Sequence, residues 1–168
     1  MPMSEYVRSL RQRIGHDVLE VPSVSILTFD ANRRVLLVRH VEGNLWTNPG
    51  GMIEPYETPA DAAVREMWEE TGLFVELTHI IGVFGGPLCS ITYANGDKAS
   101  WVSTVFGATV ISGAPRPDGD ETLEVRYVSQ DQVQYLPRKA HLDMFLLAAY
   151  GQNGAASFQP AVWRPADA

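Results

Sequence analysis

Hydrophobic residues recur at helical spacing near the start of the chain. Val7, Leu10 and Ile14 follow one another at intervals of three and four residues. This pattern predicts an amphipathic helix over residues 4–15, and Ser4 can cap its first turn.

Strand-like runs of apolar residues fill most of the chain that follows. The sequence DANRR between two such runs has turn chemistry, so residues 21–30 and 33–40 are expected to form a hairpin. The pair Asn95-Gly96 is the strongest hairpin signal in the chain. Further strands are expected over residues 73–85 and 121–129, and helices near residues 130–135 and over residues 138–151.

A central helix has signals at both of its ends. Thr58 is expected as its N-cap, Pro59 as its first residue, and Asp61 at the capping-box position. Gly72 is placed to end the helix in the left-handed conformation. The predicted helix therefore covers residues 59–71.

These elements predict an α/β (α+β) fold, in which helices cover the faces of a mixed sheet. The chain shows no internal repeat and no interdomain linker. We expect an N-terminal helix in residues 1–18, one main domain in residues 19–151, and a loosely held tail in residues 152–168, which are rich in Gly, Ala and Pro.

Composition and charge exclude several function classes. The formal net charge is −7, and an acidic surface repels polyanions, so no nucleic-acid partner is expected. No apolar run is long enough to span a bilayer and the N-terminus lacks signal-peptide features, so we expect no membrane partner and a cytoplasmic location. Cys89 is the one cysteine, which excludes an intrachain disulfide and a cysteine zinc cluster.

Three glutamates gather on the predicted central helix. Spacings of three and four residues put Glu66 beside Glu69 and Glu70 on one face. A solvated charged face usually mixes signs, yet the one nearby cation is Arg65. Converging carboxylates without lysines favour a site for a hard cation, Mg²⁺ or Mn²⁺, which prefers oxygen ligands.

The loop before this helix offers further candidates. The carboxylate of Glu57 can fold back either to the same metal ions or onto Arg65. Gly50 and Gly51 permit close approach of the backbone, which suits a loop shaped against a phosphate, although they also suit a simple turn.

Together these residues resemble the complete Nudix box. The fixed positions are matched without departure by Gly51, Glu57, Arg65, Glu66, Glu69, Glu70 and Gly72. The resemblance implies an α/β/α sandwich with a mixed central sheet. It also implies hydrolysis of a nucleoside diphosphate linked to another moiety, with Mg²⁺ or Mn²⁺ as cofactor.

The resemblance also implies roles for single residues. Glu66, Glu69 and Glu70 are expected to ligate metal, with Glu57 as an additional or water-bridged ligand, while Arg65 is expected to orient a glutamate.

In several relatives the general base comes from a loop after the central hairpin. Here the sequence RPDGDETLEVR supplies acidic residues at that place, of which Glu121 is favoured; Glu69 on the helix is the alternative.

Substrate choice is expected to lie in loops and aromatic side chains around the site. Trp46, Tyr93 and Trp101 are candidates for stacking on a base, and Arg39 or His40 for contacting a phosphate or sugar, although each also suits the core or the surface.

A small-molecule nucleotide is the expected partner. Pro87 lies near a position typical of relatives that act on ADP-ribose, so ADP-ribose or a similar nucleotide sugar comes first and a nucleoside triphosphate second.

Two rival functions use the same fold. A nucleotide sensor without turnover usually loses box glutamates, and none is lost here. The resemblance also allows an isoprenyl diphosphate isomerase, whose chemistry needs an active-site cysteine upstream of the box. Cys89, the one cysteine here, follows the box. Because many relatives are homodimers, we expect a homodimer.

Overall fold

The computed structural model describes residues 4–151 and 155–161. Its elements in chain order are α1 (Glu5–Ile14), β1 (Val18–Thr28), β2 (Val35–His40), η1 (Glu42–Asn44), β3 (Trp46–Thr47), α2 (Pro59–Thr71), β4 (Leu73–Phe84), β5 (Ser90–Thr92), β6 (Lys98–Gly113), β7 (Thr122–Val128), α3 (Gln130–Val133), α4 (His141–Tyr150) and β8 (Ser157–Phe158).

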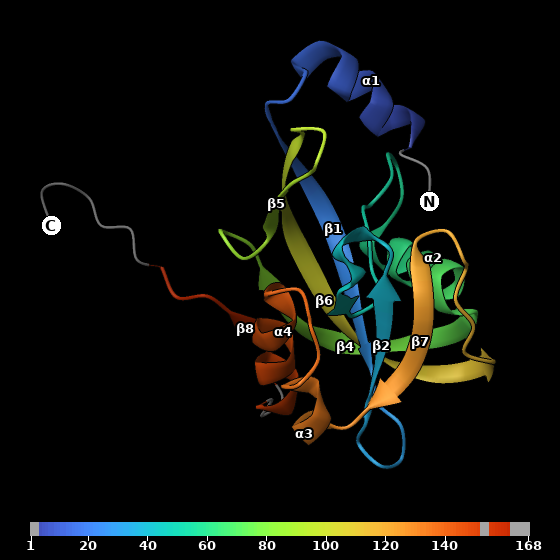
Figure 1. Ribbon diagram of the computed structural model, residues 1–168. Helices are drawn as coiled ribbons and strands as arrows, with labels where there is room; N and C mark the ends of the chain where they lie inside the picture. Colours follow the sequence, from blue (N-terminus) through green and yellow to red (C-terminus); the bar gives the residue numbers. More distant parts are fainter. Residues whose placement is uncertain (1–3, 152–154, 162–168) are drawn as a thin grey trace, which may run out of the picture.

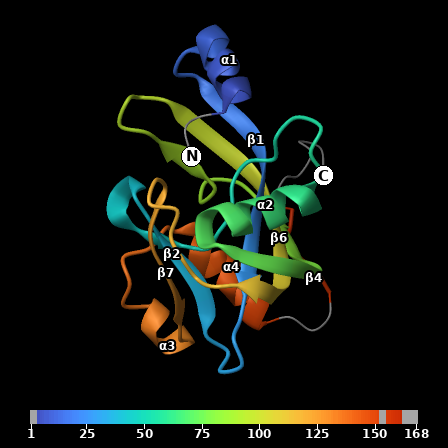
Figure 2. The same cartoon turned by 90° about the vertical axis from the view of Figure 1, so that its right-hand side faces the viewer.

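The larger sheet is mixed and carries a helix on each side. Its strands lie in the order β1-β6-β4-β8, and β5 pairs with β6. The β1–β6 and β4–β8 pairs are parallel, whereas β4–β6 and β5–β6 are antiparallel. Helices α2 and α4 lie on opposite sides of this sheet (Figures 1 and 2). This arrangement is the α/β/α sandwich that the sequence predicts.

A smaller sheet holds β3, β2 and β7 in that order, all antiparallel. The predicted hairpin between residues 21–30 and 33–40 is therefore wrong, because β1 and β2 belong to different sheets and share a single bridge between Phe29 and Val35. Both strands contain runs of consecutive buried residues. Such runs show that a strand is covered on both faces, but they carry no alternation that would identify its partner.

The hairpin expected at Asn95-Gly96 is confirmed by the antiparallel pairing of β5 with β6. The tail differs from expectation, because Ser157 and Phe158 form β8 beside β4. Residues 152–154 and 162–168 of the tail lie outside the described residues.

Helix α1 is confirmed, with Ser4 Oγ accepting a hydrogen bond from Val7 N at 3.3 Å. Its last turn is fixed to the β5–β6 hairpin. Arg11 Nη2 donates to Lys98 O at 2.7 Å, and His16 Nδ1 lies 2.7 Å from Asp97 Oδ1. No helix in the described segments is both long enough and apolar enough to cross a bilayer.

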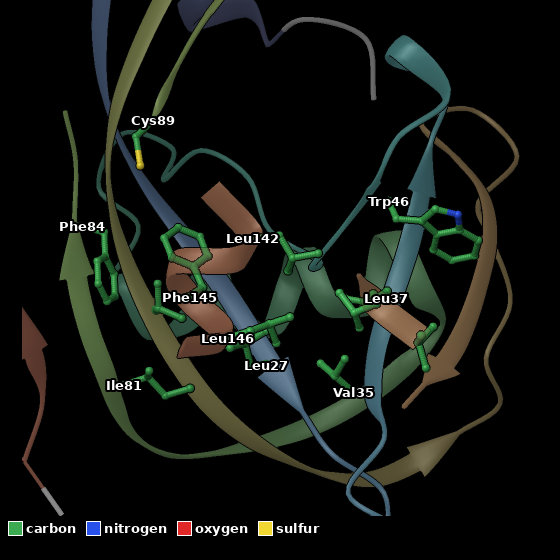
Figure 3. Close-up of a cluster of buried hydrophobic side chains, with 13 residues drawn as sticks. Leu27, Val35, Leu37, Trp46, Ile81, Phe84, Cys89, Leu142, Phe145 and Leu146 are labelled. Carbon is green, nitrogen blue, oxygen red and sulfur yellow. The ribbon is translucent and has the colours of Figure 1, made fainter. Parts of the chain in front are cut away.

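Two clusters of buried side chains form the core. One lies between α4 and the two sheets, and it includes Leu27, Leu37, Trp46 and Phe145 (Figure 3). The other lies under α2, where Met67 packs among residues of β1, β2 and β4. Helix α2 is therefore anchored to the sheet by its apolar face, which leaves its glutamates at the edge of that contact.

The ends of α2 form as the sequence predicts. Thr58 is the N-cap, and its Oγ1 accepts from Asp61 N at 3.1 Å and donates to Asp61 Oδ2 at 2.7 Å. Pro59 is the first helical residue, and Gly72 ends the helix with a φ of 68°. A φ in this left-handed region strains any residue with a Cβ.

Replacement of Thr58 by Ala should lower the free energy of unfolding by about 1 kcal/mol, because the N-cap hydrogen bond is lost. Urea denaturation of the full chain measures the change. Thr58→Ser keeps the hydroxyl and is the matched control; if it were destabilised as much as Thr58→Ala, the hydroxyl would not be the stabilising group.

Candidate active site

The loop before α2 is held by the backbone of β1. Val24 N donates to Gly51 O and Ile26 N donates to Pro49 O, each at 2.9 Å. A Cβ on Gly50 would collide with the carbonyl oxygen of Val24, and a Cβ on Gly51 would collide with the carboxylate of Glu66. Both glycines are thus required by close approach, and they bring the loop directly against the helix.

Arg65 joins this loop to the acidic face of α2. Its guanidinium donates to Glu57 at 2.8 and 2.9 Å, to Glu66 Oε1 at 2.8 Å and to Glu69 Oε2 at 3.1 Å. It also donates to Met52 O at 3.0 Å. Of the two positions considered for Glu57, the structure shows the one on Arg65, and this hydrogen bond lowers the pKa of the Glu57 carboxyl.

Glu70 lies apart from the carboxylates around Arg65. It is 4% exposed, and its Oε2 accepts from Gly50 N at 3.2 Å. Burial raises its pKa well above the ordinary value, and the neighbouring charge of Glu66 adds to the shift. A buried carboxylate with this little compensation favours a cation as its partner.

Two residues from outside the helix converge on Glu70. Donor atoms of His40, Glu70 and Glu121 all lie within 4.8 Å of one another. Burial, followed by the charge of Lys139, lowers the pKa of His40 to about 4, so its imidazole is neutral near pH 7. Nδ1 of His40 accepts a hydrogen bond from Glu42 N at 3.2 Å, so the neutral imidazole carries its proton on Nε2 and offers no lone pair to a metal. The carboxylates of Glu70 and Glu121 are the suitable ligands here for a divalent cation.

Glu121 is positioned by the acidic loop that precedes β7. Asp118 Oδ1 accepts hydrogen bonds from the backbone N–H groups of Asp120, Glu121 and Thr122, at 2.9–3.0 Å. Burial alone would raise the pKa of Asp118, but the hydrogen bonds from Thr122 and Asp120 outweigh it and the pKa is lowered. Thr122 Oγ1 also donates to Glu70 O at 3.0 Å, which ties the loop to α2.

Arg39 and Trp46 lie on the other face of the small sheet from His40. Arg39 donates to Asn44 Oδ1 at 2.7 Å and to Glu124 Oε2 at 3.2 Å. Trp46 is 3% exposed, and the guanidinium of Arg126 lies 4.3 Å from its ring centroid. Since side chains alternate along a strand, this placement does not bring either side chain beside Glu70, and their contact with substrate stays a prediction.

Cys89 is buried in the core beside α4, and burial together with the charge of Glu20 raises the pKa of its thiol to about 11. A buried, protonated thiol is a poor nucleophile, which argues against isomerase chemistry. The sequence reasoning also missed Lys139, a half-buried residue that interacts electrostatically with Glu70. Lys139 belongs to no recognisable sequence motif, so the sequence alone did not identify it.

A comparison with models of known protein families identifies the family of this chain. A model of the NUDIX domain matches residues 19–148. The chain belongs to the Nudix family.

Two bacterial proteins are similar to this chain over about two thirds of its length. A protein of Bacillus subtilis named "Putative 8-oxo-dGTP diphosphatase" is 32% identical over 104 residues, which cover 62% of this chain and 63% of that protein. A "MutT-like protein" of Streptomyces ambofaciens is 31% identical over 111 residues, which cover 66% of this chain and 65% of that protein. The chain thus spans less than two thirds of the length of either relative.

A solved Nudix structure agrees with the fold. The crystal structure of a MutT NUDIX hydrolase from Burkholderia pseudomallei superimposes with a TM-score of 0.64 and is 25% identical. The similarity covers 76% of this chain and 96% of that one. The Nudix domain therefore accounts for most of the described chain, including each of the box residues.

Replacement of Glu70 by Gln should stabilise this Nudix protein at neutral pH in the absence of divalent cations, by about 0.5–2 kcal/mol. The reason is that a buried charge is removed while the acceptor for Gly50 N is kept. Because the folded-state pKa of Glu70 is raised, the native carboxylate destabilises the fold above that pKa, and the penalty disappears as the pH falls to its ordinary value of 4.5.

Urea denaturation between pH 4.5 and pH 8 measures this difference. The exposed Glu76→Gln variant is the control and should unfold like the parent at every pH. A Glu70→Gln variant that is less stable than the parent at neutral pH would contradict the assignment of a costly buried charge.

Replacement of Asp118 by Ala should release the backbone around Glu121 and lower kcat by about 10- to 100-fold, because small misplacements of a reacting group are costly. Steady-state kinetics in an assay of the nucleotide hydrolysis proposed below measure the loss. Asp120→Ala, which changes an exposed side chain in the same loop, is the control. Equal activity of the two variants would show that Asp118 does not position Glu121.

Proposed function

We propose that the chain is a divalent-metal-dependent hydrolase that cleaves the pyrophosphate bond of a nucleoside diphosphate derivative. The observation that carries the proposal is the buried carboxylate of Glu70, which faces His40 and Glu121 beside the Nudix box helix. The carboxylates of Glu70 and Glu121 at this density favour a site for positive charge.

The chemistry of the donor set fits Mg²⁺ or Mn²⁺. Glu66, Glu69 and Glu70 would hold the metal, with Glu57 and Glu121 as further oxygen donors. Glu66 and Glu70 are buried, and burial raises the pKa of both. Arg65 donates to Glu66, so Glu70 is the carboxylate that is short of compensating charge. When bound, the ion would neutralise phosphate charge and polarise the bridging P–O bond.

Glu121 is our proposed general base. A base must lie within hydrogen-bond reach of the attacking water, and Glu121 reaches the site from a loop that Asp118 holds in place. Glu69 is the alternative, since it lies on the same helix face, but its carboxylate is engaged with Arg65. The backbone of Gly50 and Gly51 would face the phosphates across the loop.

The first substrate candidate is ADP-ribose or a similar nucleotide sugar. The position of Pro87 after the box supports this candidate. Pro87 lies in a surface turn closed by the hydrogen bond from Cys89 N to Gly86 O at 2.8 Å. The second candidate is a nucleoside triphosphate, favoured by the name of the Bacillus subtilis relative, which refers to 8-oxo-dGTP. The homodimer and the cytoplasmic location stay predictions.

The deciding experiment incubates the full chain and Mg²⁺ with a panel of nucleotide sugars, nucleoside triphosphates and dinucleoside polyphosphates. AMP plus a sugar phosphate would identify the first candidate, and a nucleoside monophosphate plus inorganic pyrophosphate the second. Glu69→Gln and Glu70→Gln should lower turnover by several orders of magnitude without unfolding the chain. Tight binding without turnover of any compound would instead identify a sensor.

A further inference from the structure

Lys139 is fixed to the small sheet by its backbone. Trp46 N donates to Pro137 O at 2.8 Å, and Lys139 N donates to Trp46 O at 2.9 Å. The segment before α4 thus runs beside β3, parallel to it, with a bridge between Trp46 and Arg138. This pairing places Lys139 on the same rigid sheet as His40.

The side chain of Lys139 points to the catalytic side of this sheet. Its neighbour Arg138 points the other way, where it donates to Asp143 at 2.6 and 2.9 Å and to the carbonyl groups at the end of α3. Successive side chains of an extended segment alternate between faces. In agreement, the charges that act on Lys139 belong to Glu42 and Glu70, and Lys139 in turn lowers the pKa of His40.

The ammonium of Lys139 has no partner of its own. Among residues 4–151 and 155–161, no hydrogen bond or ion pair to it is found. Burial lowers its pKa, although the charges of Glu42 and Glu70 act in the opposite direction. Lysines are rarely buried unless they are paired, so this position favours an anion that arrives from outside the chain.

Other cations near the box are already engaged. Arg65 donates to the carboxylates of Glu57, Glu66 and Glu69. Arg39 donates to two side chains on the far face. The chain has two lysines, and the other, Lys98, begins β6. Arg116 lies at the C-terminal end of α2, where its guanidinium is 5.9 Å from the ring centroid of Trp68. Lys139 is therefore the lysine placed beside Glu70.

We propose that Lys139 is a substrate-binding residue whose ammonium contacts a non-bridging phosphate oxygen of the diphosphate. This inference rests on the proposed function and deepens it, because it gives the site a phosphate contact from outside the Nudix box. Lys139 thus favours substrates that extend a second charged phosphate past Glu70 toward α4.

Steady-state kinetics with Mg²⁺ test the contact through Lys139→Met, which keeps the length of the side chain and removes its charge. KM should rise by about 10- to 100-fold, as expected for loss of a charge-assisted hydrogen bond, while kcat changes by less than about threefold. Lys139→Arg should recover most of the loss, and Lys98→Met should behave as the parent. An unchanged KM, or a fall in kcat alone, would overturn the proposal.

A labelling experiment tests the same contact without turnover. The full chain is acetylated with acetic anhydride in Mg²⁺, and the modification of each lysine is measured by mass spectrometry. Inorganic pyrophosphate should protect Lys139 at least fivefold and leave Lys98 unchanged, whereas adenosine should protect neither. Protection by adenosine alone would place the base at Lys139, and protection by neither would remove the contact; both outcomes overturn the proposal.

Failure of the proposed function and failure of the proposed Lys139 contact give different results. A chain that hydrolyses no member of the nucleotide panel would refute the proposed function, yet protection of Lys139 by pyrophosphate would still report the phosphate contact. A chain that hydrolyses a nucleotide with an unchanged KM in Lys139→Met would keep the function and refute the contact.

Discussion

The hydrogen bonding of one guanidinium to several carboxylates organises the whole acidic end of α2. Glu57, Glu66 and Glu69 would repel one another if left alone, and Arg65 donates to all three. The same guanidinium reaches Met52 O and so fixes the glycine loop to the helix. One side chain thus ties the loop, the helix and the carboxylates to one another, which needs a rigid fork of donors that lysine does not have.

Glu70 is the counterpart that Arg65 leaves unsatisfied. On one side of the helix face, charge is balanced within the protein; on the other, a buried carboxylate meets a neutral His40 and an unpaired Lys139. Groups that are costly to bury persist where function requires them, which is a common reason for a stability penalty at active sites. The carboxylates around Arg65 are thus compensated within the protein, whereas the carboxylate of Glu70 is not.

The elements that could be predicted from the sequence are those whose ends carry local signals. Helix α2 has a cap, a first-turn Pro and a terminal Gly, and the box glutamates fall on it at fixed spacing. The pairing of β1 was not predictable, because its continuous burial hides its partner. Trp46 and His40 were both plausible contacts, and only the register of the small sheet shows which faces Glu70. Lys139 is distant from the box in sequence, and it lies near Glu70 because the backbone of its segment pairs with Trp46.

The glycine loop has a consequence for self-association. Outer strands of open sheets carry free N–H and C=O groups, which can template the addition of a strand from another molecule. In β1, the groups of Val24 and Ile26 on that side are already bonded to the loop at Gly51 and Pro49. The backbone that brings the box to its helix therefore also covers this part of the β1 edge and leaves fewer free groups on it for a strand of another molecule.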